Sequence, residues 1–140
     1  CEFIGTTSWN ILNEQGYNME NQEVFFTEMW VQEHHKYSSM EQHVHGMGSQ
    51  LVGFYFLDVP ENSSLAIFHD PRPAKLITEL PLKQDSVQYA YNRFPFKVMP
   101  GTFVFFNSYL LHEYVVDEGI EPFRFIHFTV QAFKQNENNV

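Results

Sequence analysis

The order of hydrophobic and polar residues along the chain predicts a series of short β-strands. Runs of aromatic and β-branched residues, which favour strands over helices, are separated by turns rich in proline, glycine and polar residues. The clearest run, residues 51–59 (LVGFYFLDV), ends at Pro60 and a polar turn. The expected strands are residues 24–32, 51–59, 65–68, 87–91, 94–98, 102–106, 110–116 and 123–133. Short strands in this number, with regular turns, predict an all-β fold, either a barrel or a double-sheet jelly roll.

Little of the chain is expected to be helical. Residues 7–15 are predicted to form a short helix, and residues 74–80 one or two helical turns. The polar stretch 33–39 is predicted to be a loop. Because the chain has no internal repeat, low-complexity segment or linker, residues 1–140 are expected to form a single domain.

Composition indicates a packed globular chain and narrows its partners. Hydrophobic residues make up 44% of the 140 residues and charged residues only 18%. The net charge of −9 argues against an extended nucleic-acid surface, which needs clustered cations, and leaves room only for a small basic pocket. The single cysteine, Cys1, cannot form an internal disulfide, and no apolar run suits a membrane helix or a signal peptide. We therefore expect a cytoplasmic protein that does not act at a membrane.

Two histidines one residue apart, His43 and His45, are candidate metal ligands. In extended backbone, residues i and i+2 point to the same face about 7 Å apart, so both imidazoles can reach one ion. A third ligand must come from another strand, and His112 at the start of a later strand is the best candidate. Three ligands on one side of an iron ion leave about three of six positions open for substrate and dioxygen. Taken alone, the pair is also consistent with a polar loop edge.

Asp70 is the alternative acidic ligand. In the segment HDPRP (69–73) it can cap the turn, pair with Arg72 or reach the metal. Turn formation is the more ordinary role for an aspartate before proline.

Arg124 is the candidate anion-binding residue. Strand alternation in FRFIHF (123–128) predicts that it shares an apolar face with Ile126 and Phe128. A buried guanidinium needs an anionic partner, and a small dicarboxylate would supply one. The equally weighted alternative is an internal ion pair with one of the acidic residues Asp58, Asp70 or Glu113.

Five further residues have less specific signals. Tyr55, on the 51–59 strand, could hydrogen-bond a bound carboxylate, although core packing is the default for an aromatic residue here. His34 and His35 lie in a polar stretch and are predicted to be solvated. His127 is predicted to be structural, and Trp30 to belong to the core.

Several blocks occur together in a characteristic order. They are QHVHG (42–46), LVGFYFLDVP (51–60), FHDPRP (68–73), PGTFVFFNSYLLH (100–112) and FRFIHF (123–128). From about Val24 to Phe133 the chain resembles the iron(II)/2-oxoglutarate-dependent oxygenases. The resemblance implies an all-β double-stranded β-helix, a jelly-roll or cupin-like barrel, with one or two short helices.

The resemblance also implies roles for individual residues. It implies iron(II) as the cofactor, held by His43, His45 and His112. It implies 2-oxoglutarate as the co-substrate, with its far carboxylate held by Arg124. Because the family has an acid where this chain has His45, either the site has three histidines or Asp70 supplies the acid. We favour His45, since the i, i+2 geometry places it without a further assumption.

The function implied is oxidative. The chain is expected to be a non-haem iron(II)/2-oxoglutarate-dependent dioxygenase that hydroxylates an unidentified substrate and releases succinate and CO2, with no catalytic residue beyond the metal site. The alternatives are a cupin-type metal-binding protein or a three-histidine dioxygenase that does not use 2-oxoglutarate, and a binding module with vestigial ligands. A chain this short is expected to act on a small molecule or peptide, or to hold its substrate with a homo-oligomer partner.

Overall fold

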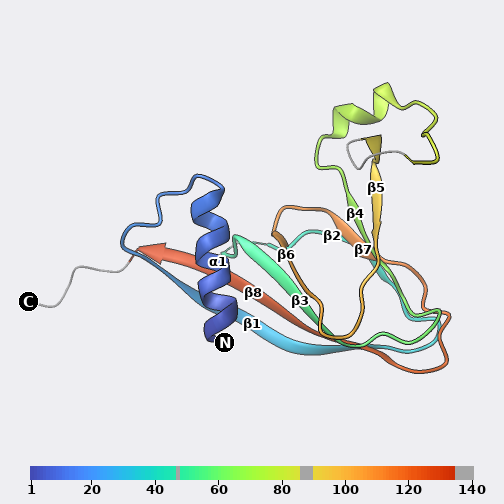
Figure 1. The fold of residues 1–140 in the computed structure, drawn as a ribbon, viewed down its shortest axis with the longest axis horizontal. Coiled ribbons are helices and arrows are strands. Elements are labelled where there is room, and N and C mark those ends of the chain that lie inside the picture. Colours follow the sequence, from blue (N-terminus) through green and yellow to red (C-terminus); the bar gives the residue numbers. More distant parts are fainter. Residues whose placement is uncertain (47, 86–89, 135–140) are drawn as a thin grey trace, which may run out of the picture.

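The computed structural model describes residues 1–46, 48–85 and 90–134, and these form two antiparallel sheets of four strands each (Figure 1). Sheet A has the order β1 (Gln22–His34), β8 (Phe123–Lys134), β3 (Leu51–Asp58) and β6 (Phe103–Asn107). Sheet B has the order β2 (Met40–His43), β7 (His112–Tyr114), β4 (Ala66–His69) and β5 (Arg93–Phe96). Apart from the consecutive strands β4 and β5, neighbouring strands come from distant parts of the sequence, as in the predicted double-sheet jelly roll.

The main core lies between the two sheets. Alternate residues of β3 and β8 point towards sheet B, a side we call the inner face of sheet A. They pack with side chains of sheet B in one buried aromatic cluster, formed by Val52, Phe54, Phe56, Ala66, Phe106, Tyr114, Phe123 and Phe125. Because this cluster is contributed by both sheets, it fixes their separation.

The opposite, outer face of sheet A is covered by a helix. Helix α1 (Glu2–Glu14) packs against β1 and β8 (Figure 1). Its Leu12 packs against Leu51, Phe128 and Val130, which are the residues of β3 and β8 that alternate with the inner ones. The two faces of sheet A are therefore both apolar but belong to two separate clusters.

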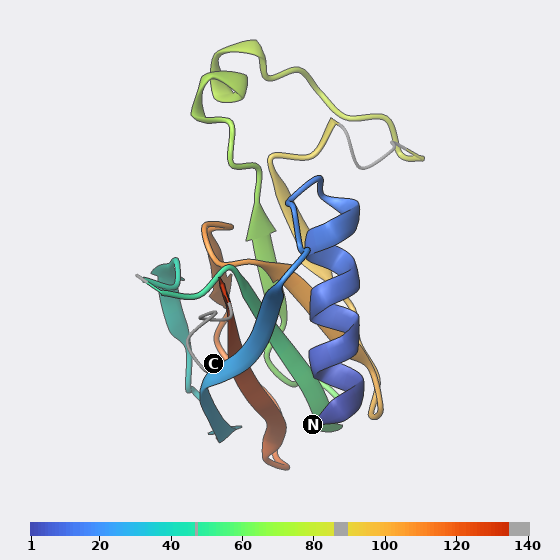
Figure 2. The ribbon, with the colours of Figure 1, turned by 90° about the vertical axis from the view of Figure 1, so that its left-hand side faces the viewer.

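A segment between β4 and β5 projects from one end of the sheets (Figures 1 and 2). It contains a 3-10 helix, η1 (Pro73–Thr78), where the sequence predicted one or two helical turns over 74–80. The predicted strand 87–91 falls largely outside the described residues.

Most of the expected strands are present, with some different boundaries. Strand β1 continues to His34, into the predicted loop, because its last residues still pair with the start of β8. Strand β2 was not predicted; the short segment Met40–His43 is extended because it pairs with β7. Helix α1 begins at Glu2 rather than at residue 7. No helix in the described part of the chain has both the length and the apolar character needed to cross a membrane.

Gly53 provides a test of the packing on both sides of β3. A Cβ added there would lie 2.1 Å from the ring of Phe128 and 2.8 Å from the carbonyl oxygen of Val104. Gly53→Ala is therefore expected to lower the free energy of unfolding by about 2–3 kcal/mol, as overpacked core substitutions do. Urea unfolding measures the change.

Gly46→Ala is the matched control. A Cβ at Gly46 would meet no heavy atom of the described chain within 4 Å, apart from its neighbours in sequence. Its effect should be within about 0.5 kcal/mol. Equal stability of the two variants would show that β3 does not pack against β8 as described.

Candidate metal centre

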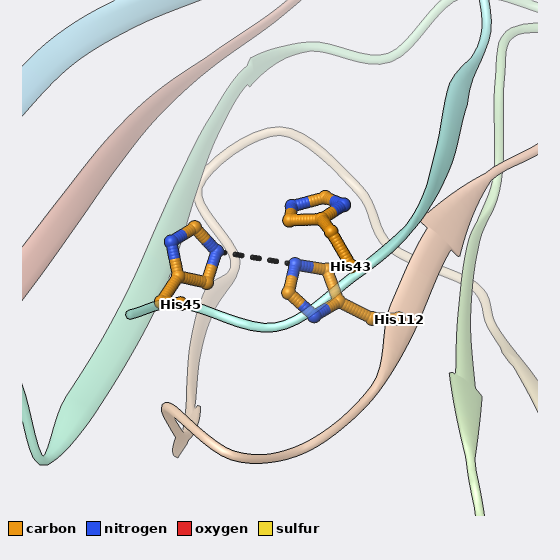
Figure 3. A group of neighbouring side chains, drawn as sticks. All are labelled: His43, His45 and His112. Atoms are coloured by element: carbon orange, nitrogen blue, oxygen red, sulfur yellow. Dashed lines mark hydrogen bonds between the residues drawn. The ribbon is translucent and has the colours of Figure 1, made fainter. Parts of the chain in front are cut away.

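Three histidines from two strands of sheet B and the segment after β2 converge in the interior (Figure 3). His43 ends β2 and pairs across the sheet with His112, the first residue of β7. His45 follows two residues later, and its backbone N–H donates to the carbonyl of Ser108 at 2.9 Å. One ring nitrogen from each residue lies within 4.8 Å of the others. The structure thus brings together His43, His45 and His112, here called the histidine triad, as their spacing predicted.

Backbone carbonyls orient two of the three rings. His43 Nδ1 lies 2.8 Å from the carbonyl oxygen of Glu41, and His112 Nδ1 lies 2.9 Å from that of Leu110. A carbonyl can only accept, so each Nδ1 carries the proton and each Nε2 keeps a free lone pair. His112 Nε2 in turn lies 3.3 Å from His45 Nε2. This is the arrangement in which imidazoles ligate a metal: one nitrogen fixed by a hydrogen bond, the other available to the ion.

Burial keeps the imidazoles of His45 and His112 neutral. Loss of solvent lowers the pKa of His45 to about 4, with the nearby His43 adding to the effect. Burial likewise lowers the pKa of His112 to about 4. Neutral imidazoles are the form that binds metal, so protons do not compete strongly for these two ligands near neutral pH.

A fourth histidine, His127, stands beside the triad. Its Nε2 lies 3.3 Å from His45 Nε2, and its ring stacks on Trp30 at a centroid distance of 3.9 Å. The two stacked residues pair directly across β1 and β8. Burial, followed by the charges of neighbouring histidines, lowers the pKa of His127 to about 3.

The sequence analysis did not assign this fourth residue to the site. It predicted a structural His127 and a core Trp30, although Trp30 is 37% exposed at one wall of the site. The available signal was alternation: His127 shares the inner face of β8 with Phe123 and Phe125.

The triad opens into a small apolar cavity of about 90 Å3. Its other walls come from β1, β2, β3, β7 and β8, and are formed by Trp30, Gln32, Met40, Phe54, Tyr114, Phe125 and His127. One water needs roughly 10–15 Å3 of such space, so the cavity holds about six or more water-sized groups. A large substrate does not fit such a volume.

Asp70, the alternative ligand, is engaged elsewhere. Its carboxylate accepts hydrogen bonds from the backbone and side chain of Arg72, and it forms an ion pair with Lys75 at 3.1 Å. The hydrogen bonds from Arg72 hold the pKa of Asp70 well below its usual range. Asp70 therefore forms the turn after β4, and the structure favours His45 as the neighbour of His43 and His112.

Arg124 does not face the triad, which corrects the expected placement. It is three residues from His127 on β8 and so points to the other side of sheet A. There it hydrogen-bonds Glu33 of β1 and contacts Asp58 of β3 at 3.3 Å. Its cross-strand partners in the register are these same two residues. The ion pair with Asp58, which the sequence left open as the alternative, is the observed one.

Tyr55 is also on the outer side of sheet A. Its ring lies 4.3 Å from that of Phe103, which in turn contacts Phe3 of helix α1. The sequence offered either core packing or a bound carboxylate for this residue, and its contacts are those of packing.

His34 differs most from its predicted environment. It was expected to be solvated, but it is only 2% exposed at the inner end of β1, and burial lowers its pKa. Its ring contacts Tyr114, Phe123 and Phe125. The adjacent His35 is exposed, as predicted, and pairs with Glu33.

Comparison with solved structures identifies the fold. An oxidoreductase of the 2OG-Fe(II) oxygenase family from Burkholderia pseudomallei matches 86% of this chain and 49% of its own, with 10% identity and a TM-score of 0.61. SnoN, a non-heme alpha ketoglutarate dependent epimerase from nogalamycin biosynthesis, matches 94% of this chain and 59% of its own, with 14% identity and a TM-score of 0.59. A prolyl-4-hydroxylase from Pseudomonas putida matches 94% and 63%, with 11% identity and a TM-score of 0.53.

These structures confirm the expected double-stranded β-helix fold. The chain spans about half to just under two thirds of their length. The comparison with curated proteins gave no match. A family model described as "Putative 2OG-Fe(II) oxygenase" matches residues 28–123, more than half of the chain and the part that contains the triad. The chain therefore belongs to the 2OG-Fe(II) oxygenase family, whose members take iron(II) and 2-oxoglutarate.

Proposed function

We propose that this chain is an iron(II)- and 2-oxoglutarate-dependent oxygenase that oxidises a small-molecule or peptide substrate, with the histidine triad as the iron ligands. The observation that supports the proposal most directly is the convergence of three ring nitrogens within 4.8 Å beside a small, largely apolar cavity. Family membership supplies the cofactor and co-substrate.

The donor set fits a divalent transition metal. His45 Nε2 lies 3.3 Å from both His112 Nε2 and His127 Nε2, and the His112 nitrogen is unprotonated because its Nδ1 carries the proton. Between His45 and each of these two neighbours, at most one of the facing Nε2 atoms can carry a hydrogen. Lone pairs of the ring nitrogens therefore point into the space between the rings, where a cation would bind favourably. Imidazole nitrogens are ligands that iron accepts, and the open cavity leaves room for further ligands.

A bound iron(II) ion would supply dioxygen activation coupled to oxidative decarboxylation of the 2-oxo acid, which yields succinate and CO2. The chain itself holds the ligands and excludes water. Backbone carbonyls fix the rings of His43 and His112, and the stack of His127 on Trp30 forms the wall beside His45. Phe54, Phe125 and other apolar side chains line the cavity, so a reactive oxidant is shielded from solvent.

Two further expectations remain proposals. We propose that residues 1–140 form one domain, which is supported by the pairing of β1 with β8 and by a core contributed by both sheets. We also propose a cytoplasmic protein without a nucleic-acid partner. In support, the described Arg72, Arg93 and Arg124 are all paired with carboxylates.

One observation favours a second candidate function. Because Arg124 faces away from the triad, a three-histidine dioxygenase that uses no 2-oxo acid is the alternative. The two functions differ in stoichiometry: only the proposed one forms succinate in step with oxygen consumption.

Removing any one triad ring should abolish tight metal binding. His43→Ala, His45→Ala and His112→Ala are each expected to weaken manganese(II) affinity by at least about 100-fold, since even the loss of an orienting partner costs 10- to 100-fold. Calorimetric titration of the full chain without oxygen measures this. The same variants should lose succinate formation when iron(II), 2-oxoglutarate and oxygen are supplied.

His35→Ala and Asp70→Asn are the matched controls, because they change an exposed histidine and the alternative acidic ligand. Both should bind manganese as the wild type does. Loss of metal in Asp70→Asn with retention in His45→Ala would overturn the ligand assignment. Absence of metal binding in the wild type would overturn the proposed function.

The buried imidazoles should make the metal-free protein sensitive to mild acid. In the unfolded chain a histidine has a pKa near 6.5, whereas His45 and His112 have values of about 4 and His127 about 3 when folded. The unfolded state therefore binds more protons below pH 6.5, and the free energy of unfolding falls as the pH is lowered from about 6.5 towards 4. On unfolding near pH 5, these three histidines should together take up roughly two to three protons from solvent.

Urea unfolding at pH 7, 6 and 5 measures this slope. His127→Phe keeps an aromatic ring against Trp30 and should reduce the proton uptake by about one. A stability that stays constant between pH 7 and pH 5 would contradict the burial of the three neutral rings.

A further inference from the structure

The cavity beside the triad contains no cationic side chain. None of the chain's eight lysine and arginine residues, all of which are described, lies among the residues that line it. Arg124 is held on the other side of sheet A by Glu33 and Asp58, with its side chain 41% exposed. If a dicarboxylic acid binds here, its far carboxylate must be met by a neutral donor.

Three buried polar atoms in this region have no partner among the described residues. One is the Nδ1 of His127, and the other two, which lie next to each other, are the hydroxyl of Tyr114 and the Nδ1 of His34. Tyr114 and His34 are each only 2% exposed, and their rings touch at a centroid distance of 5.1 Å. An unpaired buried polar group destabilises a protein by about 1–3 kcal/mol, so a pair of them side by side indicates a missing partner.

Tyr114 is placed to reach a ligand of the triad. It lies two residues after His112 on β7, and both side chains are buried on the same inner face. Residues i and i+2 of a strand are about 7 Å apart and point to the same face, so an acid bound beside His112 extends towards Tyr114. Both residues line the same cavity, and Tyr114 stacks on Phe125 behind it.

Charge balance also favours a neutral donor. Three neutral imidazoles leave a divalent ion with both of its positive charges, and a doubly negative acid cancels them. An additional buried arginine would leave a net positive charge in the apolar interior, which is unfavourable. A hydroxyl group donates a hydrogen bond to the carboxylate without adding charge.

We infer that Tyr114, supported by His34, binds the far carboxylate of the 2-oxo acid in this chain, in place of Arg124. The inference rests on the proposed function and adds the residues that select the co-substrate. The hydroxyl of Tyr114, which lines the cavity, donates to the carboxylate, and the imidazole of His34 behind it makes the second contact.

The test compares two acids that differ only at the far end. The full chain, loaded with manganese(II) and kept free of oxygen, is titrated calorimetrically with 2-oxoglutarate and with 2-oxopentanoate, which has a methyl group in place of the far carboxylate. Tyr114→Phe should weaken 2-oxoglutarate binding by about 10- to 100-fold, the range for a hydrogen bond to a charged group. Binding of 2-oxopentanoate and of manganese should change less than about twofold. His34→Phe should show the same selective loss, by about tenfold.

Two control variants make the same kinds of change elsewhere. Tyr55→Phe removes a tyrosine hydroxyl on the outer side of sheet A, and Arg124→Gln removes the cation there. Both should leave the affinity for 2-oxoglutarate unchanged. In the metal-free protein, Tyr114→Phe should be as stable as the wild type or more stable, because it removes an unpaired group.

The outcomes separate the inference from the proposed function. If the wild type binds manganese and 2-oxoglutarate but Tyr114→Phe binds the acid equally well, the inference is wrong and the proposed function stands. A loss of 2-oxoglutarate affinity in Arg124→Gln also overturns the inference. If Tyr114→Phe destabilises the metal-free protein and leaves the affinity for 2-oxoglutarate unchanged, the hydroxyl hydrogen-bonds a buried water and the inference is wrong. A wild type that binds no metal overturns both.

Discussion

The register between β8 and its neighbours decides which side chains reach the metal centre. Side chains alternate between the two faces of a strand, so a shift of one residue would exchange every inner residue for an outer one. In the observed register His127 faces the triad and Arg124 faces outwards. The ion pairs of Arg124 with β1 and β3 hold all three strands in this alignment. Phe128 against Gly53 holds it on the same outer face, since no larger residue fits there.

Both faces of sheet A are apolar, and this explains which parts of the site the sequence could predict. The pair His43 and His45 and the later His112 were identifiable because the i, i+2 spacing in extended backbone is a local property. The strand positions were identifiable from runs of aromatic residues. The jelly roll was identifiable from the number of short strands. In contrast, an apolar run on β8 does not say which face meets sheet B and which meets helix α1. The predicted position of Arg124 failed at this point, because its apolar neighbours Ile126 and Phe128 belong to the outer face.

Local sequence also failed to identify residues that do face the site, because their burial depends on strand pairing. His34 looked solvated because its neighbours in sequence are polar, yet cross-strand pairing with Phe123 carries it into the interior. His127 and Trp30 meet only because β1 and β8, about a hundred residues apart in sequence, pair in this register. Burial of such residues depends on partners distant in sequence. No window of local sequence contains that information.

The centre is also an unfavourable element of the fold when it holds no ligand. Four imidazoles with inward nitrogens and three unpaired polar atoms, one of them on His127, lie among phenylalanines, where an apolar residue of similar size would stabilise the protein more. Such a cluster persists in a packed core only if something other than stability maintains it. A divalent ion would satisfy the ring nitrogens, and an acid reaching Tyr114 would satisfy its hydroxyl, so ligand binding at the proposed site would stabilise the folded chain. Burial of the aromatic core around the cluster offsets the unfavourable free energy of burying these polar groups. The high share of phenylalanine in so short a chain is consistent with this.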